Sequence, residues 1–285
     1  MMVDNDGAKH TAVVGAGTMG TGIASVLARA GYHVELVDES PELAAAARER
    51  VVQVIRDGVR RGKITAPDAS QAEALVSACS NLEDVRAGPA LVVEAVPEVV
   101  TLKRAILQQA ERLEPELLVS NTSCISIDEL AEDLARRDRF LGMHFFNPVP
   151  AMALVEVVVG SATSSEARDR AVEVVEELGK EPIVVNDAPG FIAGRLGCLL
   201  GLEAIRMVEE GVASVEDVDR AMELGYRHPM GPLRLTDVVG LDVRSYVGRN
   251  LARTYGSRFE PPPLLEKMIA EGRLGKKTGR GFYEW

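Results

Sequence analysis

Cysteine, histidine and positive charge are scarce in this chain of 285 residues. Its three cysteines, Cys79, Cys124 and Cys198, show no CxxC spacing and are odd in number, which is typical of reduced thiols in a cytosolic protein. None of the four histidines has the spacing of a metal-ligand set, so we expect no metal site. The formal net charge of −11 leaves no surplus of Lys and Arg to neutralise phosphates, which argues against a nucleic-acid partner.

Long apolar runs are missing as well. No stretch approaches the roughly 18 to 20 apolar residues that a membrane-spanning helix needs. The N-terminal MMVDNDGAKH is acidic and polar, unlike a secretory signal. We therefore expect a cytoplasmic protein with no membrane partner. Hydrophobic residues make up 46% of the chain, which is enough to fill the cores of two domains.

Short β-branched runs alternate with helical segments up to residue 186, which predicts βαβ units around a mostly parallel sheet. Beyond that point the strand pattern stops and wide apolar stripes typical of helices follow. We predict an α/β chain, with a Rossmann-type doubly wound domain over 1–186 and an all-helical domain over 187–285. Strands are expected at 11–17, 33–38, 91–96, 117–120, 140–146, 154–159 and 182–185, and helices at 19–29, 41–57, 68–78, 102–113, 127–135 and 166–178.

The glycine-rich stretch VVGAGTMGTGIA joins the first predicted strand to the first predicted helix. Gly15 allows a tight turn, Gly17 lets a ligand approach the backbone, and Gly20 lets the helix pack closely on the strand. Thr18 and Met19 lie at the helix start, where free N–H groups and the helix dipole favour anions. Together these residues predict a pyrophosphate site for a dinucleotide cofactor.

Asp38 ends the second predicted strand, eighteen residues after Gly20. A carboxylate at this position accepts hydrogen bonds from the ribose hydroxyls of NAD. It repels the 2′-phosphate of NADP, because like charges near 4 Å interact by about 4 kcal/mol at an effective dielectric of 20. The surrounding VDESPEL contains no basic residue that would offset this repulsion. NAD is therefore the expected cofactor.

The apolar segment HFFNPVPAMALVEVV contains a histidine, His144, and a lone carboxylate, Glu156, twelve residues later. Two ionisable groups in such a segment form either a satisfied core pair or a catalytic pair. The spacing by itself does not decide between these two interpretations.

Seven motifs follow one another along nearly the whole chain: GAGTMGTGIA, VVEAVPE, SNTSCISI, HFFNPVPAMALVEV, DAPGFI, HPMGPLRLTDVVGLD and GKKTGRGFY. In this order they resemble the L-3-hydroxyacyl-CoA dehydrogenases, especially the short stand-alone type that acts on 3-hydroxybutyryl-CoA. The resemblance implies NAD-dependent, reversible oxidation of a short-chain L-3-hydroxyacyl-CoA to the 3-ketoacyl-CoA. It also implies that His144 removes the hydroxyl proton and that Glu156 orients its ring.

The same resemblance implies roles for further polar residues. Ser123 and Asn147 match positions that hydrogen-bond the reacting oxygen or thioester region and the cofactor amide, although both residue types also favour turns. Glu98, Lys103 and Asn121 match positions that line the cofactor site. An exposed helix start would equally attract a glutamate, which is the alternative for Glu98.

A basic segment, IRDGVRRGKI, follows the second predicted strand. Arg60, Arg61 and Lys63 match the helix-turn-helix where the family binds the phosphates of CoA, and a solvated basic face is the alternative. The resemblance also implies that the helical domain closes over the substrate and forms a homodimer. One departure is Gly194, which stands where relatives commonly carry an asparagine, so it removes an amide donor that would contact the substrate.

Two other functions fit parts of this pattern. One is a dehydrogenase of free 3-hydroxy acids or sugar acids that does not use CoA. The other is a non-catalytic NAD-binding protein, against which the presence of His144, Glu156, Ser123 and Asn147 argues.

Overall fold

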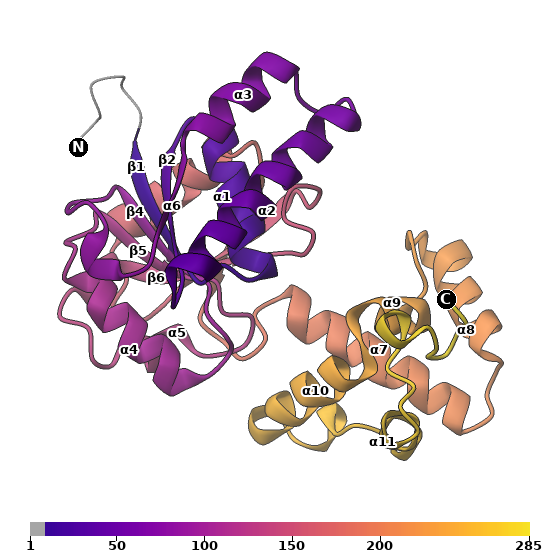
Figure 1. Ribbon diagram of the computed structural model, residues 1–285. Coiled ribbons are helices and arrows are strands. Elements are labelled where there is room, and N and C mark those ends of the chain that lie inside the picture. The colour runs from indigo at the N-terminus through magenta and orange to yellow at the C-terminus, as the bar shows by residue number, and fades with distance from the viewer. Residues whose placement is uncertain (1–8) are drawn as a thin grey trace. The chain divides into compact units, whose positions relative to one another are not determined.

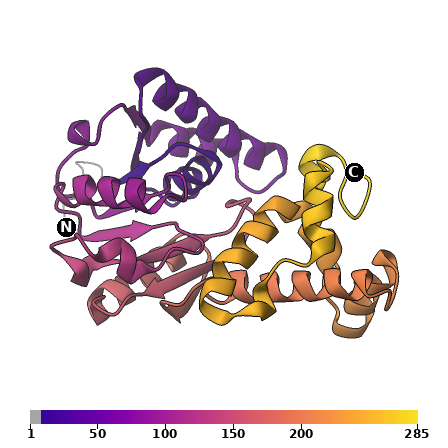
Figure 2. The ribbon, with the colours of Figure 1, turned by 90° about the horizontal axis from the view of Figure 1, so that it is seen from below.

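The computed structural model describes residues 9–285, and the prediction drawn from the N-terminal MMVDNDGAKH falls mainly on residues outside that range. The chain divides into two compact units, the first ending at Ala188 and the second beginning at Pro189 (Figure 1). The first unit contains strands and helices, whereas the second is helical (Figures 1 and 2).

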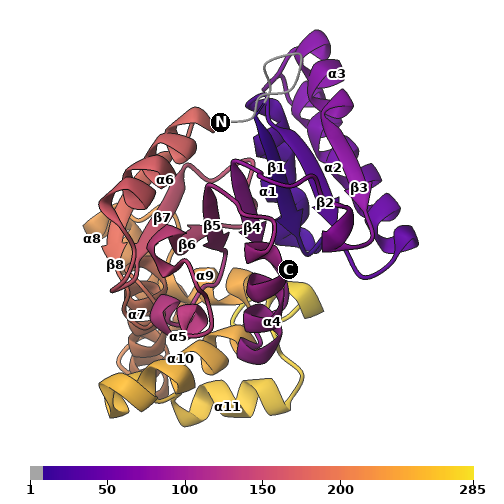
Figure 3. The ribbon, with the colours of Figure 1, turned by 90° about the vertical axis from the view of Figure 1, so that its left-hand side faces the viewer.

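One eight-stranded sheet forms the centre of the first unit, in the order β3-β2-β1-β4-β5-β6-β7-β8 (Figure 3). All neighbouring strands run parallel except β6 and β7. The predicted mostly parallel sheet is therefore confirmed. The strands are β1 His10–Val14, β2 His33–Val37, β3 Val76–Cys79, β4 Leu91–Glu94, β5 Leu117–Ser120, β6 Phe140–Phe145, β7 Leu154–Val159 and β8 Glu181–Asn186.

Helices cover both faces of this sheet, as a doubly wound fold requires. One hydrophobic cluster joins residues of α1, α2, α3 and α6 to the sheet, including Ile23, Val51 and Val174. The opposite face meets α5, since a Cβ on Gly142 would lie 2.8 Å from a side-chain carbon of Ile127. The helices of this unit are α1 Thr18–Arg29, α2 Pro41–Arg60, α3 Ala66–Ala74, α4 Val100–Glu111, α5 Ile127–Ala131 and α6 Ser165–Glu177.

The edge strand β3 was not expected, because the pattern predicted one helix over residues 68–78. The structure ends α3 at Ala74 and pairs Val76–Cys79 with β2, so the second half of that prediction is wrong. A four-residue strand is too short to show a clear alternating pattern. Its extended conformation depends on hydrogen bonds to β2, which local sequence does not report.

The second unit contains no strand between residues 189 and 285, as the apolar stripes predict (Figure 2). Its core includes Leu202, Ile205, Leu251 and Phe259. The helices are α7 Ala193–Glu209, α8 Val215–Tyr226, α9 Pro232–Val239, α10 Leu241–Tyr255 and α11 Pro263–Ala270. Across the described residues of both units, every helix is too short or too polar to cross a membrane.

Candidate active site

The glycine-rich loop turns sharply between β1 and α1. Gly15 has a φ of +98°, and a Cβ there would lie 2.7 Å from the backbone of Ala95. A Cβ on Gly20 would collide with the carbonyl oxygen of Gly15 at 1.8 Å, so only glycine lets the helix approach the turn. A Cβ on Gly17 would meet nothing within 4 Å. The backbone at Gly17 is therefore open to a ligand, while Gly15 and Gly20 build the turn beneath it.

A cavity of about 1080 Å³ opens at this loop. Helix α1 begins there with Gly17 as its N-cap and no capping side chain, which leaves its first N–H groups available to an anion. Asp38 lies in the same cavity and accepts a hydrogen bond from the backbone N–H of Ala16 at 3.0 Å. The predicted cofactor residues that line the cavity are Gly15, Gly17, Thr18, Met19 and Asp38.

His144 and Glu156 face each other across β6 and β7, whose antiparallel register pairs them directly. Nδ1 of His144 lies 2.7 Å from Oε2 of Glu156, whose side chain is 1% exposed. Because Glu156 engages Nδ1 and orients the ring, Nε2 is the nitrogen that this carboxylate leaves for other partners. β6 runs parallel to β5, β4 and β1, so His144 lies at the same edge of the sheet as the glycine-rich loop.

Glu98 organises the loop that follows β5. Its Oε1 accepts hydrogen bonds from the Thr122 hydroxyl at 2.7 Å and from the backbone N–H of Ser123 at 2.9 Å. The Ser123 hydroxyl also donates to this oxygen, at 3.2 Å. Burial by itself would raise the pKa of Glu98, but the nearby Lys103 and these hydrogen bonds hold that pKa below its ordinary value. Glu98 is thus an ionised anchor for Ser123.

Asn121 links this loop to the strand that bears the histidine. Its Oδ1 accepts a hydrogen bond from the backbone N–H of Phe145, the residue after His144, at 2.9 Å. Asn147 is exposed just beyond the end of β6. The structure therefore gathers His144, Asn121 and Asn147 at one end of this strand.

The cysteines are all free thiols. Burial raises the pKa of Cys79 to about 11 and that of Cys124 to about 12. Thiols that stay protonated at neutral pH are poor nucleophiles, so neither Cys79 nor Cys124 has the character of a catalytic thiol.

Two family models together match almost the whole chain. The 3-hydroxyacyl-CoA dehydrogenase NAD binding domain matches residues 10–188, and the C-terminal domain of the same family matches residues 190–285. The chain belongs to the 3-hydroxyacyl-CoA dehydrogenase family. The predicted resemblance, the oxidoreductase class and NAD as cofactor are confirmed by these matches.

Full-length relatives have the same layout as this dehydrogenase. A 3-hydroxybutyryl-CoA dehydrogenase of Mycobacterium tuberculosis is 41% identical over 286 residues, covering 99% of this chain and 100% of the relative. A probable 3-hydroxybutyryl-CoA dehydrogenase of Bacillus subtilis is 40% identical and covers 97% of each chain. The crystal structure of (S)-3-hydroxybutyryl-CoA dehydrogenase from Ralstonia eutropha matches with a TM-score of 0.92 at 39% identity, covering 98% of this chain and 99% of that one.

Lys103 of the dehydrogenase is 1% exposed and does not line the cavity at the glycine-rich loop. Its Nζ donates to Oε1 of Glu94 at 2.8 Å and to the carbonyl oxygen of Val96 at 3.1 Å, and lies 3.3 Å from Oε2 of Glu98. Glu94 is itself 0% exposed. Lys103 thus contacts the carboxylate of Glu98, which in turn accepts hydrogen bonds from Ser123.

The basic segment spans the end of α2 and the turn before α3. Arg60 is the last residue of α2 and forms an ion pair with Asp57. Arg61 and Lys63 are exposed, and they form no ion pair within residues 9–285. Only part of the predicted basic cluster is therefore available to an anionic ligand.

A cation in the loop cavity was missed by the sequence analysis. Arg50 of α2 lines this cavity, and its Nη2 donates to the carbonyl oxygen of Ala16 at 2.8 Å. Asp38 binds the N–H of the same residue. VDESPEL contains no cation, yet α2, which begins within this stretch at Pro41, places Arg50 at the cavity. One sequence signal could have revealed Arg50. It lies seven residues after Leu43, so the two share one face of the predicted helix, and both line the cavity.

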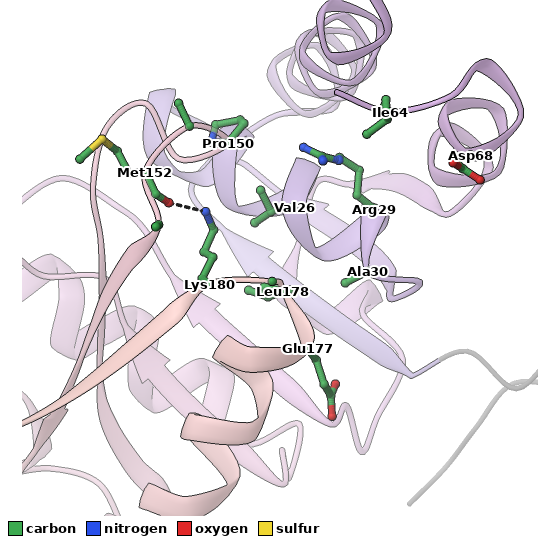
Figure 4. A pocket seen from close by; sticks show the side chains of 13 residues that line it. Val26, Arg29, Ala30, Ile64, Asp68, Pro150, Met152, Glu177, Leu178 and Lys180 are labelled. Carbon is green, nitrogen blue, oxygen red and sulfur yellow. Dashed lines mark hydrogen bonds between the residues drawn. The ribbon is translucent and has the colours of Figure 1, made fainter. Parts of the chain in front are cut away.

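Lys180 was also missed, and it fixes the chain that follows Asn147. Its Nζ donates to the carbonyl oxygens of Val149 and Met152, both at 2.7 Å, and the residue is 8% exposed. Figure 4 shows Lys180 pointing toward Met152 at the wall of a separate cavity of about 480 Å³. Burial and the positive charge of Arg29 lower the pKa of Lys180. No pattern in the sequence marks this lysine as a loop anchor.

Proposed function

We propose that this chain catalyses the reversible, NAD-dependent oxidation of a short-chain L-3-hydroxyacyl-CoA, such as 3-hydroxybutyryl-CoA, to the 3-ketoacyl-CoA. The observation that carries the proposal is the buried His144–Glu156 pair, with 2.7 Å between Nδ1 and Oε2. It stands at the same edge of the sheet as a loop built for a dinucleotide. The relatives named 3-hydroxybutyryl-CoA dehydrogenase support the choice of a short acyl chain.

In the oxidation direction, His144 takes the proton of the substrate's 3-hydroxyl on Nε2. Glu156 holds Nδ1 in its protonated form and stabilises the positive charge that develops on the imidazole. In the reverse direction the imidazolium returns the proton to the 3-keto oxygen. When bound, NAD supplies the acceptor for the hydride that leaves C3.

Ser123 and Asn147 are proposed to bind the reacting oxygen or the thioester region and the cofactor amide. Glu98 fixes the backbone of Ser123, so the serine is presented from a rigid loop. Lys180 holds the segment after Asn147 by the carbonyl oxygens of Val149 and Met152. The two proposed substrate-binding residues, Ser123 and Asn147, thus lie in or next to backbone segments that buried hydrogen bonds hold in place.

The loop cavity fits NAD. The open backbone at Gly17 and the uncapped start of α1, with Thr18 and Met19, suit the pyrophosphate. Asp38 suits the ribose hydroxyls, and Glu98, Lys103 and Asn121 remain proposed as a more distant part of the cofactor site. Arg50 would lie near the same ribose.

We predict that kcat/KM is far higher with NADH than with NADPH. Asp38→Ala should lower the ratio of these two values by roughly tenfold or more, since a lost repulsion of 1.4 kcal/mol corresponds to a factor of ten. In the Asp38→Ala variant, Arg50 should face the 2′-phosphate of NADPH and attract it. Adding Arg50→Ala to Asp38→Ala should therefore raise the ratio of kcat/KM for NADH to that for NADPH again. The measurement is kcat/KM for each coenzyme in all variants. Equal use of both coenzymes by the native enzyme would contradict this role of Asp38.

The CoA portion is proposed to meet Arg60, Arg61 and Lys63. Arg61 and Lys63 are exposed and form no ion pair in the described chain, which leaves their charges for phosphates. Arg60 is already paired with Asp57 and would contribute less.

We propose that residues 1–186 bind NAD and that residues 187–285 bind the substrate and form a homodimer. Seven large apolar side chains of α7, α9 and α10 are at least 40% exposed, which favours a partner for these helices. These side chains are Leu196 and Leu200 of α7, Leu235, Val238 and Val239 of α9, and Val243 and Tyr246 of α10. If they form the dimer interface, sedimentation equilibrium should give the mass of two chains.

The proposed activity is tested by NADH consumption with acetoacetyl-CoA and with free acetoacetate. We expect turnover with acetoacetyl-CoA and a kcat/KM for the free acid that is lower by roughly 10²-fold or more, because binding energy of the remote CoA portion contributes to the reaction. Equal use of both would point to a dehydrogenase of free acids. Tight NADH binding without turnover of either would point to a non-catalytic protein.

A further inference from the structure

Residues 121–126, the Ser123 loop, join β5 to α5 and are held at both ends. Near the start of the loop, Glu98 accepts hydrogen bonds from the backbone N–H groups of Ser123 at 2.9 Å and of Cys124 at 3.2 Å. The last residue of the loop, Ser126, is held by a different carboxylate, that of Asp187. Ser123 therefore lies between two carboxylate anchors that come from separate parts of the first unit.

Asp187 holds the end of the Ser123 loop by one carboxylate oxygen. Its Oδ2 accepts a hydrogen bond from the Ser126 hydroxyl at 2.6 Å and another from the backbone N–H of Asp128 at 3.1 Å. The Ser126 oxygen in turn accepts a hydrogen bond from the backbone N–H of Glu129, as the N-cap of α5. Hydrogen bonds to a carboxylate are roughly twice as strong as those between neutral groups. Asp187 thus fixes both the end of the loop and the start of α5.

The backbone of Asp187 is fixed where the chain leaves the sheet. β8 ends at Asn186, and the N–H of Asp187 donates to the carbonyl oxygen of Val159, the last residue of β7, at 2.9 Å. The first unit ends one residue later, at Ala188. A displacement of the chain at this exit would therefore reach the Ser123 loop through the side chain of Asp187.

The Ser123 loop is also ordered from within. The Thr122 hydroxyl donates to Glu98 at 2.7 Å, and the Thr122 oxygen accepts a hydrogen bond from the backbone N–H of Ile125 at 3.0 Å. This second bond spans Ser123 and ends at the residue before Ser126. Because the hydrogen bonds leave the backbone few free torsions between Ser123 and Ser126, a shift at Ser126 should move Ser123 as well.

We propose that Asp187 is a positioning residue of the reaction, whose carboxylate holds the Ser123 loop so that the Ser123 hydroxyl meets the bound ligands in a fixed place. This inference rests on the proposed function, in which Ser123 contacts those ligands. Misplacing a positioned group by about 1 Å can lower a rate by roughly 10²-fold. In this role Asp187 acts through Ser126 and the loop backbone, without touching a ligand itself.

The test is a double-mutant cycle between Asp187 and Ser123, with kcat for acetoacetyl-CoA as the readout. Asp187→Ala should lower kcat by roughly tenfold or more. In a Ser123→Ala background the same change should alter kcat by less than about twofold, because the hydroxyl that Asp187 positions is already absent. Asp187→Asn keeps an acceptor for both hydrogen bonds and should retain most of the native kcat. Ser126→Ala removes the other partner of the 2.6 Å hydrogen bond and should give a loss similar to that of Asp187→Ala, so the test does not depend on one variant folding.

Asp128→Ala is the matched control. The Asp128 carboxylate also lies at the start of α5, but its Oδ1 accepts a hydrogen bond from the backbone N–H of Ser161, in the turn after β7, at 2.7 Å. This variant should lower the melting temperature, as Asp187→Ala does, but leave kcat within about twofold of the native value. The comparison separates loss of stability from loss of positioning.

Hydrogen exchange measures the order of the Ser123 loop without any turnover. In Asp187→Ala, the backbone amides of Ser123 and Cys124 should exchange roughly tenfold faster than in the native protein, whereas in Asp128→Ala they should not. Unchanged exchange in Asp187→Ala would overturn the proposal, and so would losses of kcat that add to those of Ser123→Ala. Native turnover with an unchanged kcat in Asp187→Ala would refute only the role of Asp187. If the native protein reduces no acyl-CoA, it is the proposed function that fails.

Discussion

Replacing His144 with Gln is expected to lower the turnover number by roughly 10² to 10⁴, the usual contribution of a positioned acid or base. Glutamine keeps a polar group of similar size but cannot take the proton from the substrate hydroxyl. NADH affinity should barely change, since the dinucleotide is proposed to bind at Gly15, Gly17 and Asp38. The measurements are kcat with acetoacetyl-CoA and the dissociation constant of NADH from fluorescence titration.

Glu156→Gln should also slow turnover and move the pH optimum, because the amide keeps the shape of the carboxylate but not the charge that supports the imidazolium. The two residues act as a unit through the 2.7 Å contact. The double variant should therefore be little worse than His144→Gln by itself. Additive losses would indicate that the two side chains act separately.

A second histidine–glutamate pair supplies a matched control. His10, 5% exposed at the start of β1, pairs with Glu35 of β2. Because the glycine-rich loop follows the other end of β1, His10→Gln should lower the melting temperature without a large change in turnover. If His144→Gln instead showed this same pattern, the pair in HFFNPVPAMALVEVV would be a core pair and the catalytic assignment would be wrong.

Replacing Lys103 with Met is expected to destabilise the enzyme by about 3–5 kcal/mol, the usual cost of removing one partner from a buried ion pair. Lys103 and Glu94 are 1% and 0% exposed and lie 2.8 Å apart, so Met would leave a carboxylate uncompensated in the interior. For a domain of this size the melting temperature should fall by roughly 6 to 20 °C. The measurement is thermal unfolding followed by circular dichroism.

The control for this prediction removes both charges. Lys103→Met combined with Glu94→Gln should recover part of the lost stability, because a buried neutral group costs less than a buried unpaired charge. An exposed ion pair, Arg249 with Glu266, offers a comparison in which loss of one partner should change stability by less than about 1 kcal/mol. A native melting temperature in Lys103→Met would show that the buried pair does not support the first unit.

The sequence by itself determined the fold class, the cofactor and the family. The reason is that the phosphate loop depends on local backbone geometry. The turn at Gly15 and the close approach of α1 to that turn at Gly20 both need glycine, so the motif GAGTMG indicates the loop from sequence. Strands and helices that carry strong apolar patterns were also predicted. The short edge strand Val76–Cys79 was not, because its conformation depends on pairing with β2.

The tertiary structure decided which ionisable groups meet. Strand register, not spacing, sets His144 opposite Glu156. Helix packing brings Arg50 to Ala16 beside Asp38. The resemblance assigned Lys103 to the lining of the cofactor site, whereas the structure encloses its side chain with Glu94. Ion pairs and hydrogen bonds of this kind depend on distances between segments that are far apart in the chain, and burial sets the strength of their electrostatic interaction. Local sequence patterns report neither these distances nor the burial.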